Sequence, residues 1–477
     1  MTSTIGKRTA SVRIGSFSNG YERNGKKEAK ALLSRASHSP SENLVAGAPV
    51  TDSPFSIVAA RPGEHVVARQ LLAGVLRGPS VAEFQAQLDD PFYEPTDRLF
   101  CKRNESFVAH VRLVRREMRF GSAVLPVTSL QDLLVLPEYR RQGCGTALLA
   151  ESEKQMRLDG TLLGILRTNQ PQYFLQRGWA VWSRHSFSMA GAREILSRLL
   201  QCQGPTGQDS KRAVTHYNIR LWRHIELASL IQLYERNTVH AYGALVRTEP
   251  HWQWLLGRHA FDRIYVAIDG PERFELEGVA PIVGYAVMKE GRIVELMVAA
   301  EHPEAAPQLL ARACSDAIEQ DAHYVRLDAP VGDGLHDIVA RAGGELGYHE
   351  SVHGEVCLVK LLDPHHLIEL IGEQLAQRAR DAGIGLPVEL GLQIDDGRYT
   401  LEIRSRTAKL RPGRSCRSYL ECSVTELAQL LLGHLDIHVA VAAQRVVAST
   451  RVALELACVL MPKLPLWRPP WEELAAS

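Results

Sequence analysis

An apolar strand that runs into a glycine-rich turn and then into a helix is the feature that constrains this chain most. Residues 124–135 have the pattern of a strand, residues 146–158 have helical spacing, and Gly143 and Gly145 lie between them. Because glycine has no Cβ, the backbone of such a turn can adopt left-handed dihedrals and approach an anion closely. The turn therefore predicts an α/β fold with an anion site at the end of the strand.

The residues of the turn favour a pyrophosphate as that anion. Successive backbone N–H groups form a nest, and the N-terminus of the following helix adds partial positive charge. Arg140 and Arg141 supply further charge, and Thr146 can cap the helix or bond a phosphate oxygen. The alternative is a glycine-rich turn without a ligand, which a six-residue pattern alone does not exclude.

Short strands alternate with helices around this turn, as in a mixed α/β sheet. We expect strands at 55–60, 108–115, 124–135, 162–166 and 179–188, and helices at 64–76, 146–158 and 171–176. Beyond a linker (QCQGPTGQDS), similar elements return: a helix at 225–236, strands at 264–267, 282–289 and 293–298, and a helix at 305–320. The pattern predicts two α/β domains of one kind, although no direct sequence repeat is visible.

The chain divides into four predicted parts. Residues 1–50 are rich in Ser, Lys, Arg, Gly and Asn, so we expect a disordered arm that cannot form a core. The two α/β domains are expected at 51–205 and 211–362. A C-terminal domain is expected at 363–477, with a helix at 365–382 and a hairpin turn at Asp395-Asp396-Gly397.

Composition argues against several classes of protein. The 55 Lys and Arg residues nearly balance 54 Asp and Glu residues, and a net charge of +1 disfavours a nucleic-acid partner. The eight cysteines are dispersed without a C-x-x-C pair, so we expect no metal site and reduced thiols in the cytoplasm. No window reaches the roughly 20 apolar residues of a membrane span, and we expect no signal peptide.

Two segments resemble the GNAT family of N-acetyltransferases. Residues 133–146 (LLVLPEYRRQGCGT) are similar to its motif A, Q/R-x-x-G-x-G/A, which Arg140, Gly143 and Gly145 match. Residues 169–179 (NQPQYFLQRGW) are similar to the family element N-x-x-A-x-x-F/Y-Y-x-x-x-G-F, at the family's usual distance. The resemblance implies an acetyl-CoA site in the first domain.

The same resemblance implies which residues contact acetyl-CoA. The pantetheine would pair with the backbone of the motif strand, the pyrophosphate would lie on the turn, and the thioester would lie beside the second element. In that order the residues are Leu133, Leu134 and Val135; Arg140, Arg141, Gln142, Gly143, Cys144, Gly145 and Thr146; and Asn169 and Gln170.

The acid and the base are less clear than the cofactor site. The family's general-acid tyrosine aligns with Phe174, which has no proton to give, and the adjacent phenol, Tyr173, is either the acid or a packed aromatic residue. Asp132 lies on the motif strand and Glu295 on the comparable strand of the second domain. Either is a candidate base, and the alternative for both is a carboxylate without a catalytic role.

The rest of the chain extends the resemblance. In the second domain, residues 299–304 (AAEHPE) replace the nest with two carboxylates and no glycine, so this domain should not bind CoA. Residues 399–403 and 420–433 are similar to a sterol carrier protein-like module. Together with residues 245–256 (LVRTEPHWQWLL), they make the chain similar to the enhanced intracellular survival family, in which the terminal carboxylate acts as base. The ending here, WEELAAS, lacks that family's terminal aromatic residue.

Two functions remain open. The first is an acetyl-CoA-dependent N-acetyltransferase acting on a primary amine of a small molecule or a side chain, in a chain that can also form a homo-oligomer. The second is an acyl-CoA-binding sensor or carrier with little or no transferase activity. The replacement of the expected tyrosine by Phe174 favours the second.

Overall fold

The computed structural model describes residues 55–75, 78–182, 185–203, 216–270, 281–349, 351–352, 355–413 and 416–475. The predicted arm at 1–50 lies outside these residues. Three sheets and the helices packed on them account for the described chain. No helix among these residues combines the length and the apolar character needed to cross a membrane.

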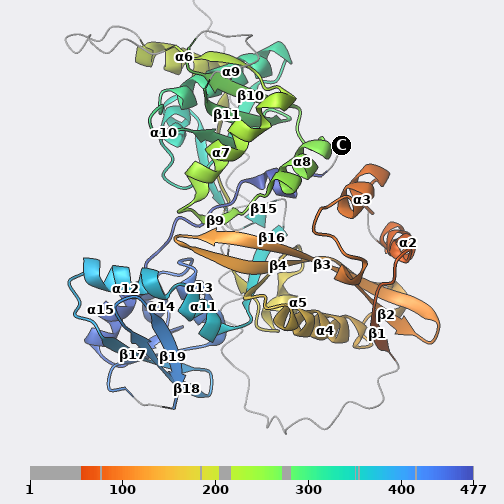
Figure 1. Cartoon of the computed structure of the whole chain (residues 1–477), viewed down its shortest axis with the longest axis vertical. Helices are drawn as coiled ribbons and strands as arrows, with labels where there is room; N and C mark the ends of the chain where they lie inside the picture. Colours follow the sequence, from red (N-terminus) through yellow and green to blue (C-terminus); the bar gives the residue numbers. More distant parts are fainter. Residues whose placement is uncertain are drawn as a thin grey trace, which may run out of the picture. The chain divides into compact units, whose positions relative to one another are not determined.

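The first sheet carries the motif strand. Nine described strands make it up, in the order β1-β2-β3-β4-β5-β16-β15, with β6 paired to β16 and β9 paired to β3. Their bounds are β1 Ser56–Ala59, β2 Arg98–Arg103, β3 Ser106–Phe120, β4 Ala123–Val135, β5 Leu163–Thr168, β6 Ala180–Val181, β9 Tyr242–Leu245, β15 Ser351–Val352 and β16 Glu355–Leu361. The helices of this region are α2 His65–Val75, α3 Val81–Leu88, α4 Cys144–Leu158 and α5 Pro171–Leu175. α4 packs against β3 and β4 (Figure 1).

The predicted strand at 124–135 and the helices at 64–76, 146–158 and 171–176 are confirmed within two residues. The strand predicted at 108–115 is longer, because β3 pairs with β2 and β4 and, near its end, with β9. Its charged stretch, residues 115–119 (RREMR), interrupts the apolar pattern, and this is why the prediction stopped too early. The helix α3 and the strand β2 were not predicted.

The second sheet has the order β14-β7-β13-β12-β11-β10-β8. Its strands are β7 His185–Gly191, β8 Asn218–Leu221, β10 Arg263–Ile268, β11 Ile282–Lys289, β12 Arg292–Val298, β13 Tyr324–Asp328 and β14 Glu345–His349. The helices are α6 Ala192–Gln203, α7 Leu227–Thr238, α8 Glu249–Gly257, α9 Ala305–Glu319 and α10 Gly334–Arg341. The β12-α9-β13 unit has a parallel strand pair, as the β4-α4-β5 unit of the first sheet does.

The two sheets exchange strands. β7 follows β6 of the first sheet in sequence, yet it pairs with β13 and β14 of the second. Conversely, β16 follows β14 of the second sheet, yet it pairs with β5 and β6 of the first. The strand predicted at 179–188 is therefore two strands in two sheets, because β6 pairs with β16 of the first sheet whereas β7 lies between β13 and β14 of the second. The second sheet therefore includes β7 from the earlier part of the chain, and the first sheet includes β16 from the later part.

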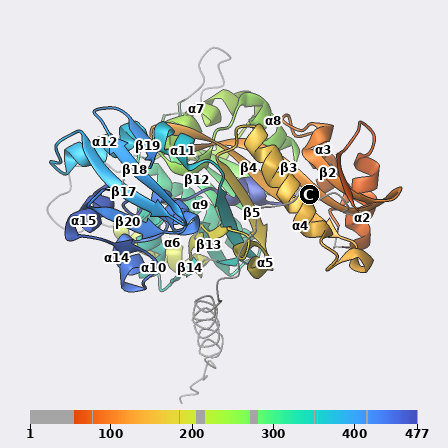
Figure 2. The same ribbon diagram turned by 90° about the horizontal axis from the view of Figure 1, so that it is seen from below.

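The third sheet has the order β19-β18-β17-β20-β21 and belongs to the C-terminal region (Figure 2). Its strands are β17 Val388–Ile394, β18 Gly397–Ile403, β19 Ala408–Pro412, β20 Tyr419–Cys422 and β21 Val447–Ala448. Its helices are α11 Pro364–Leu370, α12 Gly372–Asp381, α13 Val424–Leu431, α14 Ile437–Ala442 and α15 Arg451–Leu460. The predicted hairpin is confirmed, with Ile394 opposite Gly397. The likeness of this region to sterol carrier proteins stays a prediction.

The helix predicted at 365–382 is in fact two helices, which meet at Ile371. The break coincides with a close approach, because a Cβ on Gly372 would lie 2.4 Å from the backbone nitrogen of Ala408. The continuous hydrophobic pattern hid this break, since both helices bury residues such as Leu367 and Leu375 in one core.

Candidate active site

The two parallel strands of the first sheet part where the motif strand ends. β4 and β5 are paired as far as Leu130 and Leu166, but β4 runs on to Val135 and β5 to Thr168. β3 still pairs with β4 as far as Val135 on the other side. Among the described residues, no strand covers the edge of residues 131–135 that faces β5. Leu133, Leu134 and Val135 therefore lie beside a gap in the hydrogen-bond ladder, where an extended chain of a ligand can bond to the backbone.

The turn after β4 has the conformation of an anion nest. It begins as a short 3-10 helix, Pro137–Tyr139, and continues through Arg141 and Gly143, which both have left-handed backbones, with φ of +61° and +87°. α4 begins directly afterwards at Cys144. A Cβ on Gly143 would have no heavy atom within 4 Å. Open space thus lies beside Gly143 at the start of α4, where unpaired helix N–H groups can bind an anion.

Two side chains of the turn, those of Arg140 and Gln142, form hydrogen bonds with nearby groups. Arg140 donates through Nε to the Val135 carbonyl oxygen at 3.1 Å. Gln142 donates to the Glu138 carbonyl oxygen at 2.7 Å and accepts a hydrogen bond from Arg103 at 3.0 Å. These bonds fix the turn without using the N–H groups at the N-terminus of α4.

Tyr173 points at the start of α4. Its hydroxyl lies 3.5 Å from Thr146 Oγ1 and 3.3 Å from the position of a Cβ on Gly145. The guanidinium of Arg177 lies 4.0 Å from the centre of its ring and donates to Thr146 Oγ1 at 3.3 Å. Phe174 instead turns inward and packs edge-on against Trp179, 6.0 Å between ring centres. The phenol of this pair therefore lies at the nest, and the phenyl ring lies in the core.

Asn169 and Gln170 follow the end of β5 and are exposed. The Thr168 hydroxyl accepts the backbone N–H of Gln170 at 3.0 Å. Both residues thus lie on the β5 side of the parted strands, and their place beside the thioester stays a prediction.

A buried histidine, His110 of β3, bonds to β4 next to the residues that β5 leaves unpaired. Arg98 carries only donors, so His110 Nε2 accepts from it at 3.2 Å and the proton must lie on Nδ1, which donates to the Asp132 carbonyl oxygen at 3.2 Å. Asp132 has φ of +54° and sits in a β-bulge, where its carboxylate approaches Arg112 Nε at 3.5 Å. Burial, together with the charge of Arg98, lowers the pKa of His110 to about 3. His110 is therefore neutral near pH 7 and is not a proton carrier there.

This histidine predicts a pH-dependent stability. Its pKa in the folded chain lies below the ordinary value of 6.5, so the stabilisation is complete above pH 6.5 and is lost as the pH falls toward 3. Between pH 7 and pH 5 the loss is about 2 kcal/mol. We expect His110→Gln to flatten the fall in unfolding free energy over this interval, as measured by urea denaturation. The exposed His323→Gln should leave the slope unchanged, and an equal slope in His110→Gln would contradict the assignment.

Residues of the second domain contact the outer part of β3. Arg116 forms an ion pair with Asp90, and its guanidinium lies 5.2 Å from the ring of Phe92 and 5.6 Å from that of Trp254. Trp254 donates through Nε1 to the Ala86 carbonyl oxygen at 2.7 Å. These contacts join α8 of one domain to α3 and β3 of the other.

His251 is a buried polar side chain without a partner. It lies on α8 with ring centres 5.9 Å from Phe92 and 5.4 Å from Trp254. Neither ring nitrogen has a hydrogen-bond partner within the described chain. Burial lowers its pKa to about 4, so it too is neutral near pH 7. Its polar atoms face a region that a water or a polar ligand would have to satisfy.

A buried ion cluster holds the C-terminal segment. Arg247 donates two hydrogen bonds to Glu295, at 2.8 and 2.6 Å, and one to Glu472 at 2.6 Å. Arg247 and Glu295 are fully buried and Glu472 nearly so. The Tyr285 hydroxyl donates to Glu295 at 2.5 Å. Because Glu295 is fully engaged inside the second domain, these contacts favour a structural role for it over that of a base.

The remaining carboxylate of the C-terminal segment meets β5. Glu473 bonds to Arg167 at 2.6 Å and also to Arg468. Arg258 donates to the carbonyl oxygens of Glu472 and Leu474. These bonds hold residues 472–474 against Arg258 of the second domain and against Arg167 of β5, and residues 476–477 with the terminal carboxylate lie outside the described residues. Isolated charged and imidazole residues form no pattern in a sequence, so His110, His251, Arg247 and Glu472 were not predicted as parts of a site.

The second domain lacks the features of the nest. β12 leads into α9 through residues 299–304, and Glu304 occupies the N-cap without a side-chain hydrogen bond. Tyr217 and His302 are bonded to each other there at 3.1 Å. Glu301 and Glu304 are exposed, and their charges would repel a phosphate.

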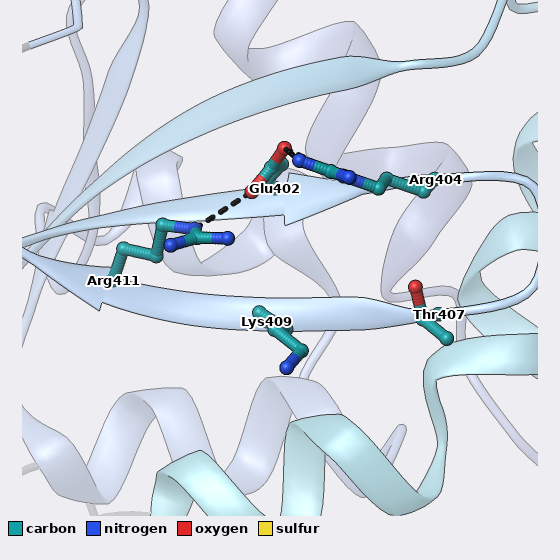
Figure 3. A pocket seen from close by; sticks show the side chains of 5 residues that line it. All are labelled: Glu402, Arg404, Thr407, Lys409 and Arg411. Atoms are coloured by element: carbon teal, nitrogen blue, oxygen red, sulfur yellow. Dashed lines mark hydrogen bonds and ion pairs between the residues drawn. The ribbon is translucent and has the colours of Figure 1, made fainter.

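A separate pocket lies on the third sheet (Figure 3). Glu402 accepts from Arg404 at 2.8 Å and from Arg411 at 2.8 Å, and Thr407 and Lys409 complete the lining. The two arginines lower the pKa of Glu402. This charged lining does not suit a lipid. Two of its cationic side chains, Arg404 and Arg411, are already paired with Glu402.

The first domain matches an acetyltransferase family model. Residues 57–182 match the family model described as the acetyltransferase (GNAT) domain. This part of the chain is therefore similar to GNAT acetyltransferase domains, as its motif predicted. No curated protein matches the sequence at a significant level.

Solved structures extend the likeness to most of the chain. A GCN5-related N-acetyltransferase from Kribbella flavida is 18% identical, with a TM-score of 0.66 over 88% of this chain and 99% of its own. One from Anabaena variabilis is 13% identical, with a TM-score of 0.66 over 87% and 99%. Eis1 from Mycobacterium abscessus is 16% identical, with a TM-score of 0.60 over 86% and 97%. At these identities the likeness is one of fold, and it confirms the predicted tandem α/β domains followed by a third sheet.

Proposed function

We propose that the chain is an acetyl-CoA-dependent N-acetyltransferase that acts on a primary amine. The observation that carries the proposal is the turn after β4, where two left-handed residues lead into α4 beside a strand whose parallel partner has parted from it. The diphosphate of acetyl-CoA binds the N–H groups at the start of α4. Its pantetheine lies along residues 131–135, and the thioester reaches the region of Asp132 and Asn169.

Transfer then follows from proximity and backbone polarisation. A backbone N–H group of β4 donates to the thioester carbonyl oxygen, so that the amine attacks a polarised carbon and the C–N bond forms as the C–S bond breaks. The amine loses a proton, and the departing CoA thiolate gains one. Asp132 is proposed to accept the first, because it lies on the motif strand with its Oδ2 oxygen 3.5 Å from Arg112 Nε and not hydrogen-bonded. With Phe174 in the core, the thiolate is protonated from water.

The likeness to Eis1 supports the same proposal at the level of the whole chain. Eis1 shares the fold over nearly its full length, and the sequence resembles the enhanced intracellular survival family. The competing function, an acyl-CoA-binding protein without turnover, is favoured by the burial of Phe174 where an acid is expected.

The experiment that separates these functions is a transfer assay. Release of free CoA from acetyl-CoA is followed in the presence of a polyamine, an aminoglycoside, a lysine-containing peptide or an amino acid. Acetylated product from any amine, confirmed by its mass, supports the transferase. Bound acetyl-CoA with no product from any amine would support the sensor or carrier instead.

We expect Tyr173→Phe to act on acetyl-CoA binding. Its hydroxyl lies at Thr146 and Gly145, at the N-terminus of α4, so its loss should raise the KM for acetyl-CoA several-fold, the effect of one hydrogen bond. The turnover number should change by less than about two-fold. Tyr139→Phe, which removes a hydroxyl from the same turn, is the control. A turnover number that falls ~100-fold at unchanged KM would identify Tyr173 as the general acid.

A further inference from the structure

Two cysteines lie in contact beneath the phosphate-binding turn. Cys101 is on β2 and Cys144 is the first residue of α4, and their sulfur atoms are 2.8 Å apart. Both thiols are free, and both side chains are buried. Cys144 stands between Gly143 and Gly145, so its backbone is part of the turn itself.

The contact is close enough for a covalent bond after a small movement. A disulfide has a length of about 2.05 Å, so the sulfurs would need to approach by roughly 0.8 Å. Cys101 is held on both sides, because it pairs with Ile57 of β1 and Ala109 of β3. Cys144 lies at a helix end next to a glycine with φ of +87°. The movement should therefore fall on Cys144 and on the N–H groups of the turn.

Cys144 is the thiol that is set to react first. The N-terminus of α4 stabilises a thiolate at this position. The contact with the Cys101 thiol lowers the pKa of Cys144, whereas the same contact raises that of Cys101. Arg141, Gln142 and Gly143, which directly precede Cys144, are exposed, whereas the Cys144 side chain is buried.

We propose that Cys101 and Cys144 form a reversible disulfide under peroxide, and that this bond weakens acetyl-CoA binding by displacing the turn. The Cys144 thiolate attacks one oxygen of hydrogen peroxide, which gives a sulfenic acid and releases hydroxide, protonated to water. The Cys101 thiol then attacks the sulfenic sulfur, which forms the S–S bond and releases a second water. Two thiols are oxidised and one peroxide is reduced, and a dithiol reductant reverses the reaction.

The inference rests on the proposed function, since it places acetyl-CoA on this turn. Coupling between the disulfide and the ligand must be reciprocal. If the bond weakens acetyl-CoA binding, then bound acetyl-CoA must disfavour the bond by the same factor. Saturating acetyl-CoA should accordingly lower the extent of disulfide formation.

The full-length chain is treated with hydrogen peroxide, with and without acetyl-CoA, and the disulfide is measured by peptide mass spectrometry after alkylation. We expect a Cys101–Cys144 bond that acetyl-CoA suppresses and that dithiothreitol removes. Calorimetry of the oxidised protein should show acetyl-CoA affinity about ten-fold weaker than that of the reduced protein. Cys101→Ser should form no such bond and lose the ten-fold change. Cys458→Ser, at a partly exposed thiol, should behave as the unchanged chain.

Two results would overturn the inference. One is alkylation of both thiols after peroxide, with no crosslink; the other is a crosslink that leaves the affinity unchanged. If the reduced chain binds no acetyl-CoA, the proposed function fails separately. In that case amide hydrogen exchange at residues 140–146 decides, because equal exchange in the oxidised and reduced chains would show that the bond does not displace the turn.

Discussion

Gly143→Glu is expected to abolish acetyl-CoA binding, with a dissociation constant raised at least ~100-fold. The substitution acts in two ways. A side chain at φ of +87° is strained by roughly 1–2 kcal/mol, and the carboxylate enters the open space where the diphosphate is expected, so that like charges meet. Calorimetry with acetyl-CoA measures the loss and should give one site per unchanged chain.

The matched control is Gly160→Glu. Gly160 follows the other end of α4, also has a left-handed backbone, with φ of +74°, and also has open space where a Cβ would lie. It therefore reproduces the strain and the added charge without the nest, and its affinity should stay within about two-fold of the unchanged chain. If Gly143→Glu binds acetyl-CoA as tightly as the unchanged chain and melts at the same temperature as the control, the nest is not part of the acetyl-CoA site. Two sites in the unchanged chain would show that the second domain binds acetyl-CoA as well.

The sequence predicted the nest because its information is local. A strand, two glycines and a helix fix the conformation of the turn within about fourteen residues, so Arg141 and Gly143 could be located without knowledge of the rest of the fold. The exchange of β7 and β16 between the sheets was not predictable in this way. Both strands are short, and the sheet that each one joins depends on partners more than a hundred residues away in the sequence.

The same limit applies to the surroundings of the site. The hydrogen bonds of His110 depend on Arg98 and on the bulge at Asp132. These groups come together only when β2, β3 and β4 pair in the sheet. Glu295 was considered as a base because strand position is readable from sequence. Its burial against Arg247 was not readable, because the two residues are 48 positions apart and meet through tertiary packing.

Arg247→Met is expected to lower the free energy of unfolding by about 3–5 kcal/mol, the cost of breaking a buried ion pair. Methionine keeps much of the volume but leaves Glu295 and Glu472 buried without their shared cation. Burial raises the pKa of Glu472, but Arg247 outweighs it and holds that pKa below the ordinary value. Loss of the guanidinium thus favours protonation of both carboxylates, or release of the C-terminal segment that carries Glu472.

Intrinsic fluorescence reports this change directly, because the Arg247 guanidinium lies 4.9 Å from the ring of Trp252 and 5.2 Å from that of Trp471. In urea, Arg247→Met should unfold at lower denaturant with an altered emission spectrum before the transition. Arg451→Met breaks an exposed pair with Glu455 and should change stability by less than about 1 kcal/mol.

A further variant removes the carboxylate charges that Arg247→Met leaves without a cation. If unpaired carboxylates cause the loss, the triple variant Arg247→Met, Glu295→Gln, Glu472→Gln should recover part of the stability, because neutral amides cost less to bury than charges. If Arg247→Met alone is as stable as the unchanged chain, the cluster does not hold the C-terminal segment. If the triple variant is less stable than Arg247→Met, the lost packing and hydrogen bonds, including that from Tyr285, outweigh the charge. Transfer activity measured alongside tells whether the anchored segment, with Glu473 on Arg167, is needed at the first sheet.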